Sequence, residues 1–114
     1  MVVQAGRSRV LGVVAVAETP RTRMVGLLGR DALGPGDGLL LRPCGMVHTC
    51  FMRFPIDVLF TDRAGQALAL FPEVRPFRLA WGGFRARQAI ELPAGTLARA
   101  GVAPGVRVEL EPVP

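Results

Sequence analysis

Thiol and imidazole side chains gather in one short segment of the chain. The two cysteines and the single histidine are Cys44, His48 and Cys50. Thiolates and imidazoles bind zinc and copper, and even spacing would put all three on one face of an extended strand. We nevertheless predict no metal and no cofactor, because free cysteine is commonly a buried core residue and a lone histidine commonly satisfies a hydrogen bond.

The same segment could support nucleophilic catalysis. His48 could take the proton from Cys50, with Asp57 or Glu91 orienting the imidazole. No oxyanion hole is evident in the sequence, so whether the protein is an enzyme stays open. A disulfide between Cys44 and Cys50 would need the chain to turn between them, because six residues of straight strand span about 20 Å.

A second candidate group is the block Arg53-Phe-Pro-Ile-Asp57. The guanidinium of Arg53 could bind a carboxylate or phosphate, or it could pair with Asp57 and pin the bend at the proline. Glu91 lies inside an apolar run and needs a partner if it is buried, for which Arg53 and Arg23 are candidates. Arg23 could equally lie on a solvated helix face.

These groups predict a polar pocket with apolar walls. Its candidate ligand-binding residues are His48, Arg53, Asp57 and Glu91, followed by Cys50 and Arg23. Neighbouring apolar bulk comes from Met46, Phe51, Met52 and Phe54, and apolar walls with few polar groups describe small-ligand sites as well as ordinary core. We therefore predict a small-ligand- or protein-binding domain, with a small enzyme using His48 with Cys50 or Asp57 as the first alternative.

The elements that must position these residues are short. Apolar segments separated by Gly and Pro predict strands at 10–17, 39–41, 46–52, 57–61, 66–71, 88–92 and 106–110. Asp62–Gly65 predicts a hairpin turn. Thr19-Pro20 predicts a helix start, with Met24, Leu27 and Leu28 on one face, and a second short helix follows Pro93.

About seven short strands and two short helices predict a mainly β (α+β) fold. We expect an antiparallel β-sandwich or small barrel, with the helices covering open ends. The 114 residues suffice for a single domain spanning 1–114.

The charge is basic but dispersed. All 14 basic residues are arginine, and the formal net charge is +5. No three basic residues are consecutive, so nucleic acid or another anionic surface is a weaker alternative than a small anionic molecule or a protein partner. The apolar run 10–17 is too short for a membrane span and lacks a signal-peptide layout, so we expect a cytoplasmic protein.

Three blocks of the chain, in order, resemble the family called domain of unknown function 192. They are Glu18-Thr-Pro-Arg-Thr-Arg-Met-Val-Gly-Leu-Leu-Gly-Arg30, the segment 42–62, and Glu91-Leu-Pro-Ala-Gly-Thr96 with Gly101 and Gly105. The resemblance covers residues 14–110. It implies a compact, mainly β bacterial or archaeal domain with no established activity.

The chain departs from the family pattern at two positions. The late block usually continues with Gly-Asp, where this chain has Gly105-Val106, so any chemistry of that aspartate is missing here. The family also commonly has an aromatic residue where this chain has Cys50, which weakens the case for a thiolate ligand at that position.

Overall fold

The computed structural model describes residues 1–6 and 9–113, and these form ten strands and two short helices. The elements are β1 (Val2–Ala5), β2 (Arg9–Val13), β3 (Ala15–Ala17), α1 (Pro20–Val25), β4 (Leu39–Leu41), β5 (Met46–His48), β6 (Ile56–Thr61), β7 (Ala67–Val74), β8 (Leu79–Trp81), β9 (Gln88–Pro93), α2 (Thr96–Ala100) and β10 (Val108–Glu111).

A five-stranded sheet in the order β3-β4-β9-β6-β7 forms the centre of the molecule. Its strands are antiparallel except for β3 and β4, which run parallel. Every residue of β6, Ile56–Thr61, is buried, because this strand lies between two neighbours and is covered on both faces. That is why its sequence shows an apolar run rather than a regular alternation.

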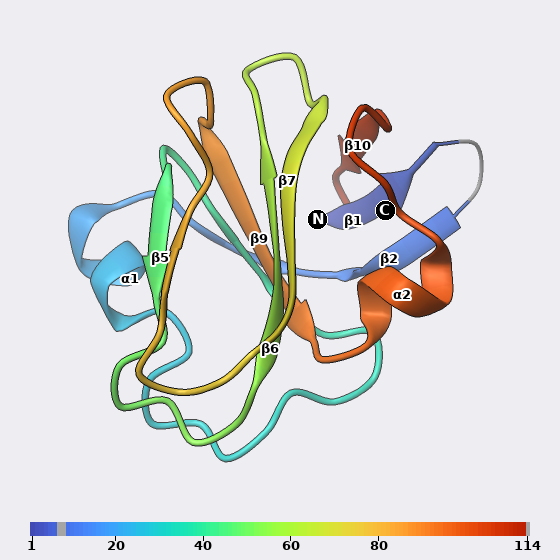
Figure 1. Cartoon of the computed structure of the whole chain (residues 1–114). Helices are drawn as coiled ribbons and strands as arrows, with labels where there is room; N and C mark the ends of the chain where they lie inside the picture. The colour runs from blue at the N-terminus through green and yellow to red at the C-terminus, as the bar shows by residue number, and fades with distance from the viewer. Residues whose placement is uncertain (7–8, 114) are drawn as a thin grey trace.

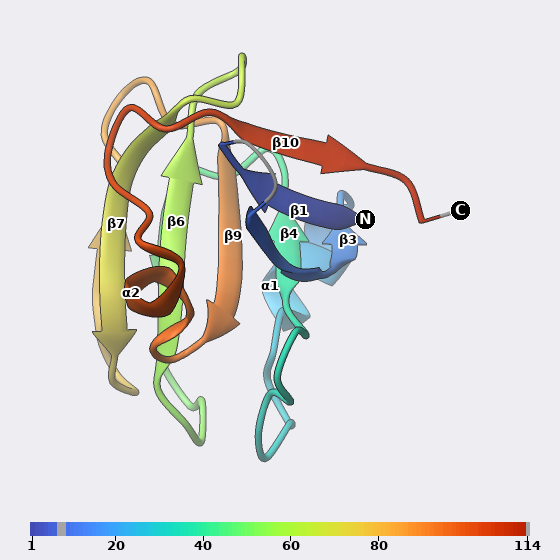
Figure 2. The same ribbon diagram turned by 90° about the vertical axis from the view of Figure 1, so that its right-hand side faces the viewer.

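Different elements cover the two faces of the central sheet (Figures 1 and 2). One face packs against α2 and a three-stranded sheet in the order β10-β1-β2, around Leu59 and Ile90. The other face packs against a two-stranded ribbon of β5 and β8, around Val58 and Phe60. The core therefore divides into two clusters, one on each side of the sheet.

The predicted mainly β fold is confirmed. The described residues build ten strands rather than about seven, and their sheets do not close into a barrel, which leaves the sandwich-like arrangement. The predicted strand 10–17 is divided at Val14 between β2 and β3, which belong to different sheets. The N-terminal strand β1 and the strand β8 were not predicted.

The first helix begins as predicted and ends early. The Thr19 hydroxyl accepts from the Thr22 amide at 3.1 Å, and Gly26 ends the helix with φ 49°. Leu27 therefore lies in the turn after the helix, where it is buried, while Met24 within the helix is 75% exposed. The prediction of an apolar helix face formed by these residues is wrong. Among the described residues, neither helix has the length and apolar character needed to cross a membrane.

Candidate functional site

A cavity of about 480 Å³ opens between α1 and the ribbon strand β5, over strands β4 and β9 of the central sheet. Its volume falls in the range of small-molecule sites, roughly 300–1,000 Å³. Most of its wall is apolar, with side chains from Met24, Leu27, Leu28, Leu41, Met46, Val47 and Met52. Four side chains that can ionise also line it, namely Arg23, Cys44, His48 and Glu91.

Glu91 is the most deeply placed of the four. It lies on β9, paired with Leu39 of β4 on one side and Val58 of β6 on the other. The residue is 4% exposed, and its Oε2 atom is buried without a hydrogen-bond partner among the described residues. Burial disfavours the ionised form and raises the pKa of Glu91 to about 7. Near neutral pH this carboxyl is therefore protonated in a large fraction of molecules and can donate as well as accept a hydrogen bond.

Arg23 reaches the cavity from α1. Its Nη1 donates to the carbonyl of Pro43 at 2.8 Å, which fixes the side chain. Its Nε is buried and has no hydrogen-bond partner, and no ion pair joins Arg23 to a carboxylate within the described ranges. Two residues that line the cavity thus each have a buried polar atom without a hydrogen-bond partner in the described part of the chain, a guanidinium nitrogen of Arg23 and a carboxyl oxygen of Glu91.

Burial and the charges of both Arg23 and Glu91 act on the pKa of the Cys44 thiol. Burial is the largest effect and raises the pKa of this thiol, while backbone hydrogen bonding at Met46 lowers it. The thiol Sγ donates to the Met46 carbonyl at 3.2 Å. Smaller effects come from the charge of Glu91, which raises the pKa, and from that of Arg23, which lowers it. The net result is a raised pKa, so the thiol stays protonated at neutral pH and is a weak nucleophile.

His48 and Cys50 do not form the predicted pair at this cavity. His48 is exposed on β5 and lines the cavity edge. The strand ends at His48, and Cys50 lies in the turn that follows, half-buried and outside the cavity lining. The even spacing that would put Cys44, His48 and Cys50 on one face applies only to a continuous strand, and this segment is strand only at 46–48.

No metal cluster forms from these residues. Within residues 1–6 and 9–113, no group of three or more His, Cys, Asp or Glu side chains is arranged to hold a metal ion. Both cysteines are free thiols.

Arg53 and Asp57 lie away from the cavity and from each other. Arg53 pairs with Asp31 at 2.6 Å on the surface, so the predicted ion pair between Arg53 and Asp57 is wrong. Asp57 is fully buried. Its Oδ1 accepts from the amides of Glu73 and Gly95, and its Oδ2 accepts from the amide of Leu97.

The structure therefore brings together Arg23, His48 and Glu91 and separates them from Arg53, Asp57 and Cys50. It adds Cys44, which the sequence presented as a metal ligand or a disulfide partner and not as a ligand-binding residue. It also adds Met24 and Leu28 at the cavity edge, which the sequence assigned to a core-facing helix stripe. The sequence did not identify these two as site residues, because the spacing of apolar residues does not distinguish an exposed methionine or leucine from a buried one.

A family model matches nearly the whole chain. The model is DUF192, described as "Uncharacterized ACR", and it covers residues 1–110. The resemblance inferred from the three sequence blocks is thereby confirmed. No curated protein matches the chain.

Two solved structures share the fold. One is a protein of unknown function from Novosphingobium aromaticivorans, with 20% identity and a TM-score of 0.86, covering 96% of this chain and 84% of that one. The other is described as a "putative transcription regulator" from Sinorhizobium meliloti, with 26% identity and a TM-score of 0.82, covering 94% of this chain and 90% of that one.

Proposed function

Because the chain belongs to the DUF192 family, whose description assigns no activity, we propose a function from its own cavity. The protein binds a small amphipathic acid, a molecule with one carboxylate and an apolar body. The observation that carries this proposal is that two residues lining one cavity, Arg23 and Glu91, each have a buried polar atom, Nε and Oε2, with no hydrogen-bond partner among the described residues. Buried polar atoms normally have partners, so a pair without them points to a ligand that supplies the missing bonds.

The ligand's carboxylate fits Arg23. A guanidinium whose Nη1 is already fixed on Pro43 still offers Nε and Nη2, and two parallel donors suit the two oxygens of a carboxylate. Holding the side chain in place before binding reduces the entropy lost on binding.

Glu91 fits the same ligand as a neutral acid. Protonated, it donates a hydrogen bond to a ligand oxygen, whereas the ionised form would repel a carboxylate held by Arg23. Because the pKa of Glu91 is about 7, affinity for an acid falls as the pH rises above that value.

The apolar wall sets the rest of the ligand. Leu41, Val47 and Met52 present buried apolar surface to the cavity, and burying an alkyl or aryl group there contributes about 25 cal/mol per Å². Methionines adapt their shape to irregular groups, which favours a chain-like apolar body.

Calorimetric titration with octanoate, octanol and octylamine tests the proposal. We expect octanoate to bind at pH 6 at least tenfold more tightly than octanol, because only the acid pairs with Arg23. Equal affinity for the acid and the alcohol, or no binding of either, would overturn the proposal.

The enzyme alternative receives less support. Asp57 lies on the other face of the sheet from the cavity, where it bonds backbone amides, and so is not in place to orient His48. The raised pKa of Cys44 also makes the one cavity thiol a poor nucleophile.

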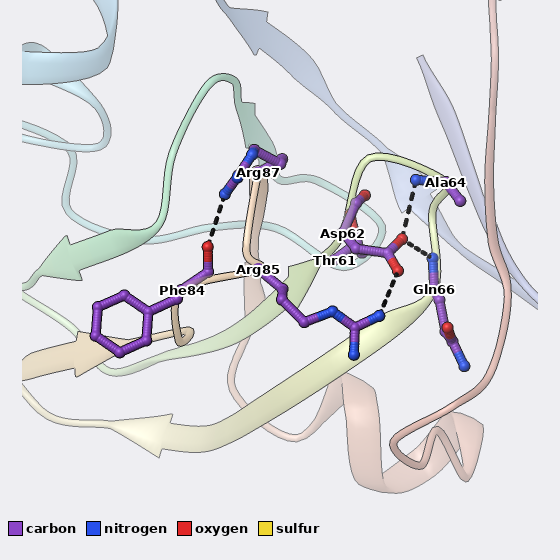
Figure 3. Close-up of polar contacts among 7 residues, drawn as sticks. All are labelled: Thr61, Asp62, Ala64, Gln66, Phe84, Arg85 and Arg87. Carbon is purple, nitrogen blue, oxygen red and sulfur yellow. Dashed lines mark hydrogen bonds and ion pairs between the residues drawn. The ribbon is translucent and has the colours of Figure 1, made fainter.

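The nucleic-acid alternative has the basic charge and the description of the Sinorhizobium relative in its favour. Many guanidinium groups are nevertheless engaged within the protein. Figure 3 shows Arg87 donating to the Phe84 carbonyl and Arg85 reaching the Asp62 carboxylate in the hairpin turn. Arg42 and Arg53 pair with Glu18 and Asp31. These contacts leave fewer arginines free for phosphates.

We also keep cytoplasmic location as a prediction.

A further inference from the structure

The outward side of the β5–β8 ribbon is exposed and mostly apolar, with His48 as its polar member. Met46 pairs with Trp81, and His48 pairs with Leu79, while Val47 and Ala80 between them are buried against the central sheet. Since side chains alternate along a strand, both pairs point outward. Leu79 is 66% exposed and Trp81 50%. The ribbon thus buries its small inner side chains and presents its large ones to the outside.

Aromatic pairs extend this surface beyond both ends of the ribbon. Trp81 packs edge-on against Phe84 with ring centroids 4.9 Å apart. Phe51 packs the same way against Phe77 at 5.4 Å. We call Met46, Phe51, Phe77, Leu79, Trp81 and Phe84 together the ribbon face. Contiguous exposed apolar surface of this kind marks interaction sites.

Phe51 and Phe77 are held in strained backbone conformations. Their φ angles are 65° and 61°, a left-handed conformation that bulky residues rarely adopt. Both rings are exposed, so burial does not compensate for the strain. Thr49 holds their two loops together, because its main chain bonds Phe77 and Arg78 and its hydroxyl bonds Arg75. Strain retained at exposed rings points to contact with something outside the chain.

The cavity opens beside this face. Met24, Val25, Leu28 and Met46 line the cavity and are also exposed, so they form its rim. Met46 belongs to both surfaces. An amphiphile in the cavity would therefore enter and leave next to the ribbon face.

The charge around the ribbon face is positive. Arg75 and Arg78 flank Phe77, are exposed, and have no ion pair within the described part of the chain; Arg78 Nη1 donates to the Phe77 carbonyl at 3.3 Å, which leaves its other nitrogens for an outside group. The whole chain carries a net charge of +5. An anionic surface would attract arginines that lie beside inserted apolar groups.

We propose that the ribbon face docks on the surface of an anionic lipid bilayer, with Phe51, Phe77 and Leu79 entering the interface and Arg75 and Arg78 contacting the headgroups. This proposal goes beyond the proposed function. It rests on that function in one respect only, the assumption that the molecule entering the cavity is an amphipathic acid. A bilayer is a source of amphipathic acids, so docking would bring the cavity to its ligand.

The composition of the face favours lipid over single-stranded nucleic acid. Met46 and Leu79, with Met24, Val25 and Leu28 at the rim, offer aliphatic surface that inserts into acyl chains but does not stack on bases. The rings of each aromatic pair already pack against each other.

Flotation with vesicles tests the proposal. The full chain is mixed with vesicles of phosphatidylglycerol and phosphatidylcholine, or of phosphatidylcholine alone. We expect binding to the anionic vesicles only, lowered at least tenfold in the double variant Phe51→Asn/Phe77→Asn. Asparagine tolerates a positive φ, so this variant keeps the fold. Leu79→Ser should lower binding independently. Val10→Ser is the matched control, since Val10 is as exposed as Phe77 but lies on β2.

The remaining outcomes separate this proposal from the proposed function. Wild-type protein that binds octanoate but not anionic vesicles would overturn the docking proposal alone. Vesicle binding without octanoate binding would overturn only the proposed ligand. Docking on lipid would also be overturned if Val10→Ser lost vesicle binding as much as the double variant does. The same holds if the wild type bound an oligo-dT probe more tightly than anionic vesicles and the double variant abolished that binding.

Discussion

The carboxyl groups of Asp57 and Glu91 belong to adjacent strands of one sheet and lie on its opposite faces. In the pairing of β6 with β9, Asp57 lies opposite Leu92 and Val58 lies opposite Glu91. Leu92 packs in the cluster that contains Leu97 of α2, and Val58 packs in the cluster beneath the ribbon. The two acids thus occupy neighbouring paired positions of the ladder, and neighbouring positions point to opposite faces of a sheet. On one face the carboxylate of Asp57 accepts from three backbone amides, and on the other Glu91 lines a cavity.

We expect Asp57→Asn to destabilise the fold by about 3 kcal/mol. The amide would put an N–H group against at least one backbone N–H that the carboxylate now accepts, leaving buried donors unpaired. Urea unfolding at pH 7 measures the change. Asp31→Asn is the control, because Asp31 is exposed and pairs only with exposed Arg53, and its effect should stay within about 0.5 kcal/mol. A small effect of Asp57→Asn would show that these bonds contribute little.

Glu91→Gln should remove a pH dependence of stability. The pKa of Glu91 is about 7 in the folded protein, against an ordinary value of 4.5, so the folded state binds the proton more tightly than the unfolded state. The stabilisation is complete below pH 4.5 and is lost as the pH rises toward 7 and above, a difference of about 3 kcal/mol by linkage.

The unfolding free energy of the wild type should therefore fall by about 3 kcal/mol more than that of Glu91→Gln between pH 4 and pH 8. Comparing the two proteins at each pH cancels the titration of all other groups. Parallel pH profiles would mean that Glu91 ionises normally and that the cavity is wetter than the structure indicates.

Thr49→Val should loosen the loops that carry Phe51 and Phe77. The Thr49 hydroxyl donates to the Arg75 carbonyl at 2.6 Å and accepts from the Arg78 amide at 2.9 Å, and valine replaces it without either bond. We expect a loss of about 2 kcal/mol in unfolding free energy and faster amide exchange at Phe77 and Arg78. Thr49→Ser keeps the hydroxyl and should retain most of the protection; equal exchange in both variants would contradict this role.

The sequence predicted the strands that are regular and locally encoded. The hairpin at Asp62 follows from its turn residues, and its carboxylate accepts from the amides of Ala64 and Gln66 as such turns require. The cap at Thr19 was likewise predictable from two adjacent residues. Both depend on contacts within a few residues, which a sequence displays directly.

The candidate site was predicted less well because it depends on long-range register. Glu91 was identified as a group that would need a partner and Arg23 as one candidate for it, yet only the three-dimensional structure, with β9 paired between β4 and β6, shows that both line one cavity. Asp57 appeared equivalent to Glu91 in the sequence, since both are acids in buried strands. The face each one serves is decided by strands and a helix distant in the chain.

Cys44 should alkylate slowly, and an acid ligand should slow it further. Burial raises the pKa of the thiol and the side chain lines the cavity, so little thiolate is present at pH 7.5 and a bound ligand would cover it. Iodoacetamide labelling of Cys50→Ser, followed by mass spectrometry, isolates the Cys44 rate. Labelling as fast as an unfolded thiol, or a rate unchanged by saturating octanoate, would contradict the placement of the ligand.

Arg23→Met should abolish selective binding of the acid while leaving the apolar part of the site in place. Methionine replaces the unbranched stem of arginine up to Nε and supplies no donor, so octanoate loses its charge-assisted bonds and its affinity at pH 6 should fall at least tenfold, to that of octanol. The matched control is Arg21→Met, an exposed arginine of the same helix outside the cavity lining, which should bind octanoate like the wild type. If both variants lose affinity equally, the acid is held by the general positive charge of the protein and not by the unpartnered Nε of Arg23. If neither variant does, the carboxylate binds elsewhere. Calorimetry of the three proteins with octanoate and octanol distinguishes these results. Only a direct contact with Arg23 makes the affinities for the acid and the alcohol equal in Arg23→Met while they stay different in Arg21→Met.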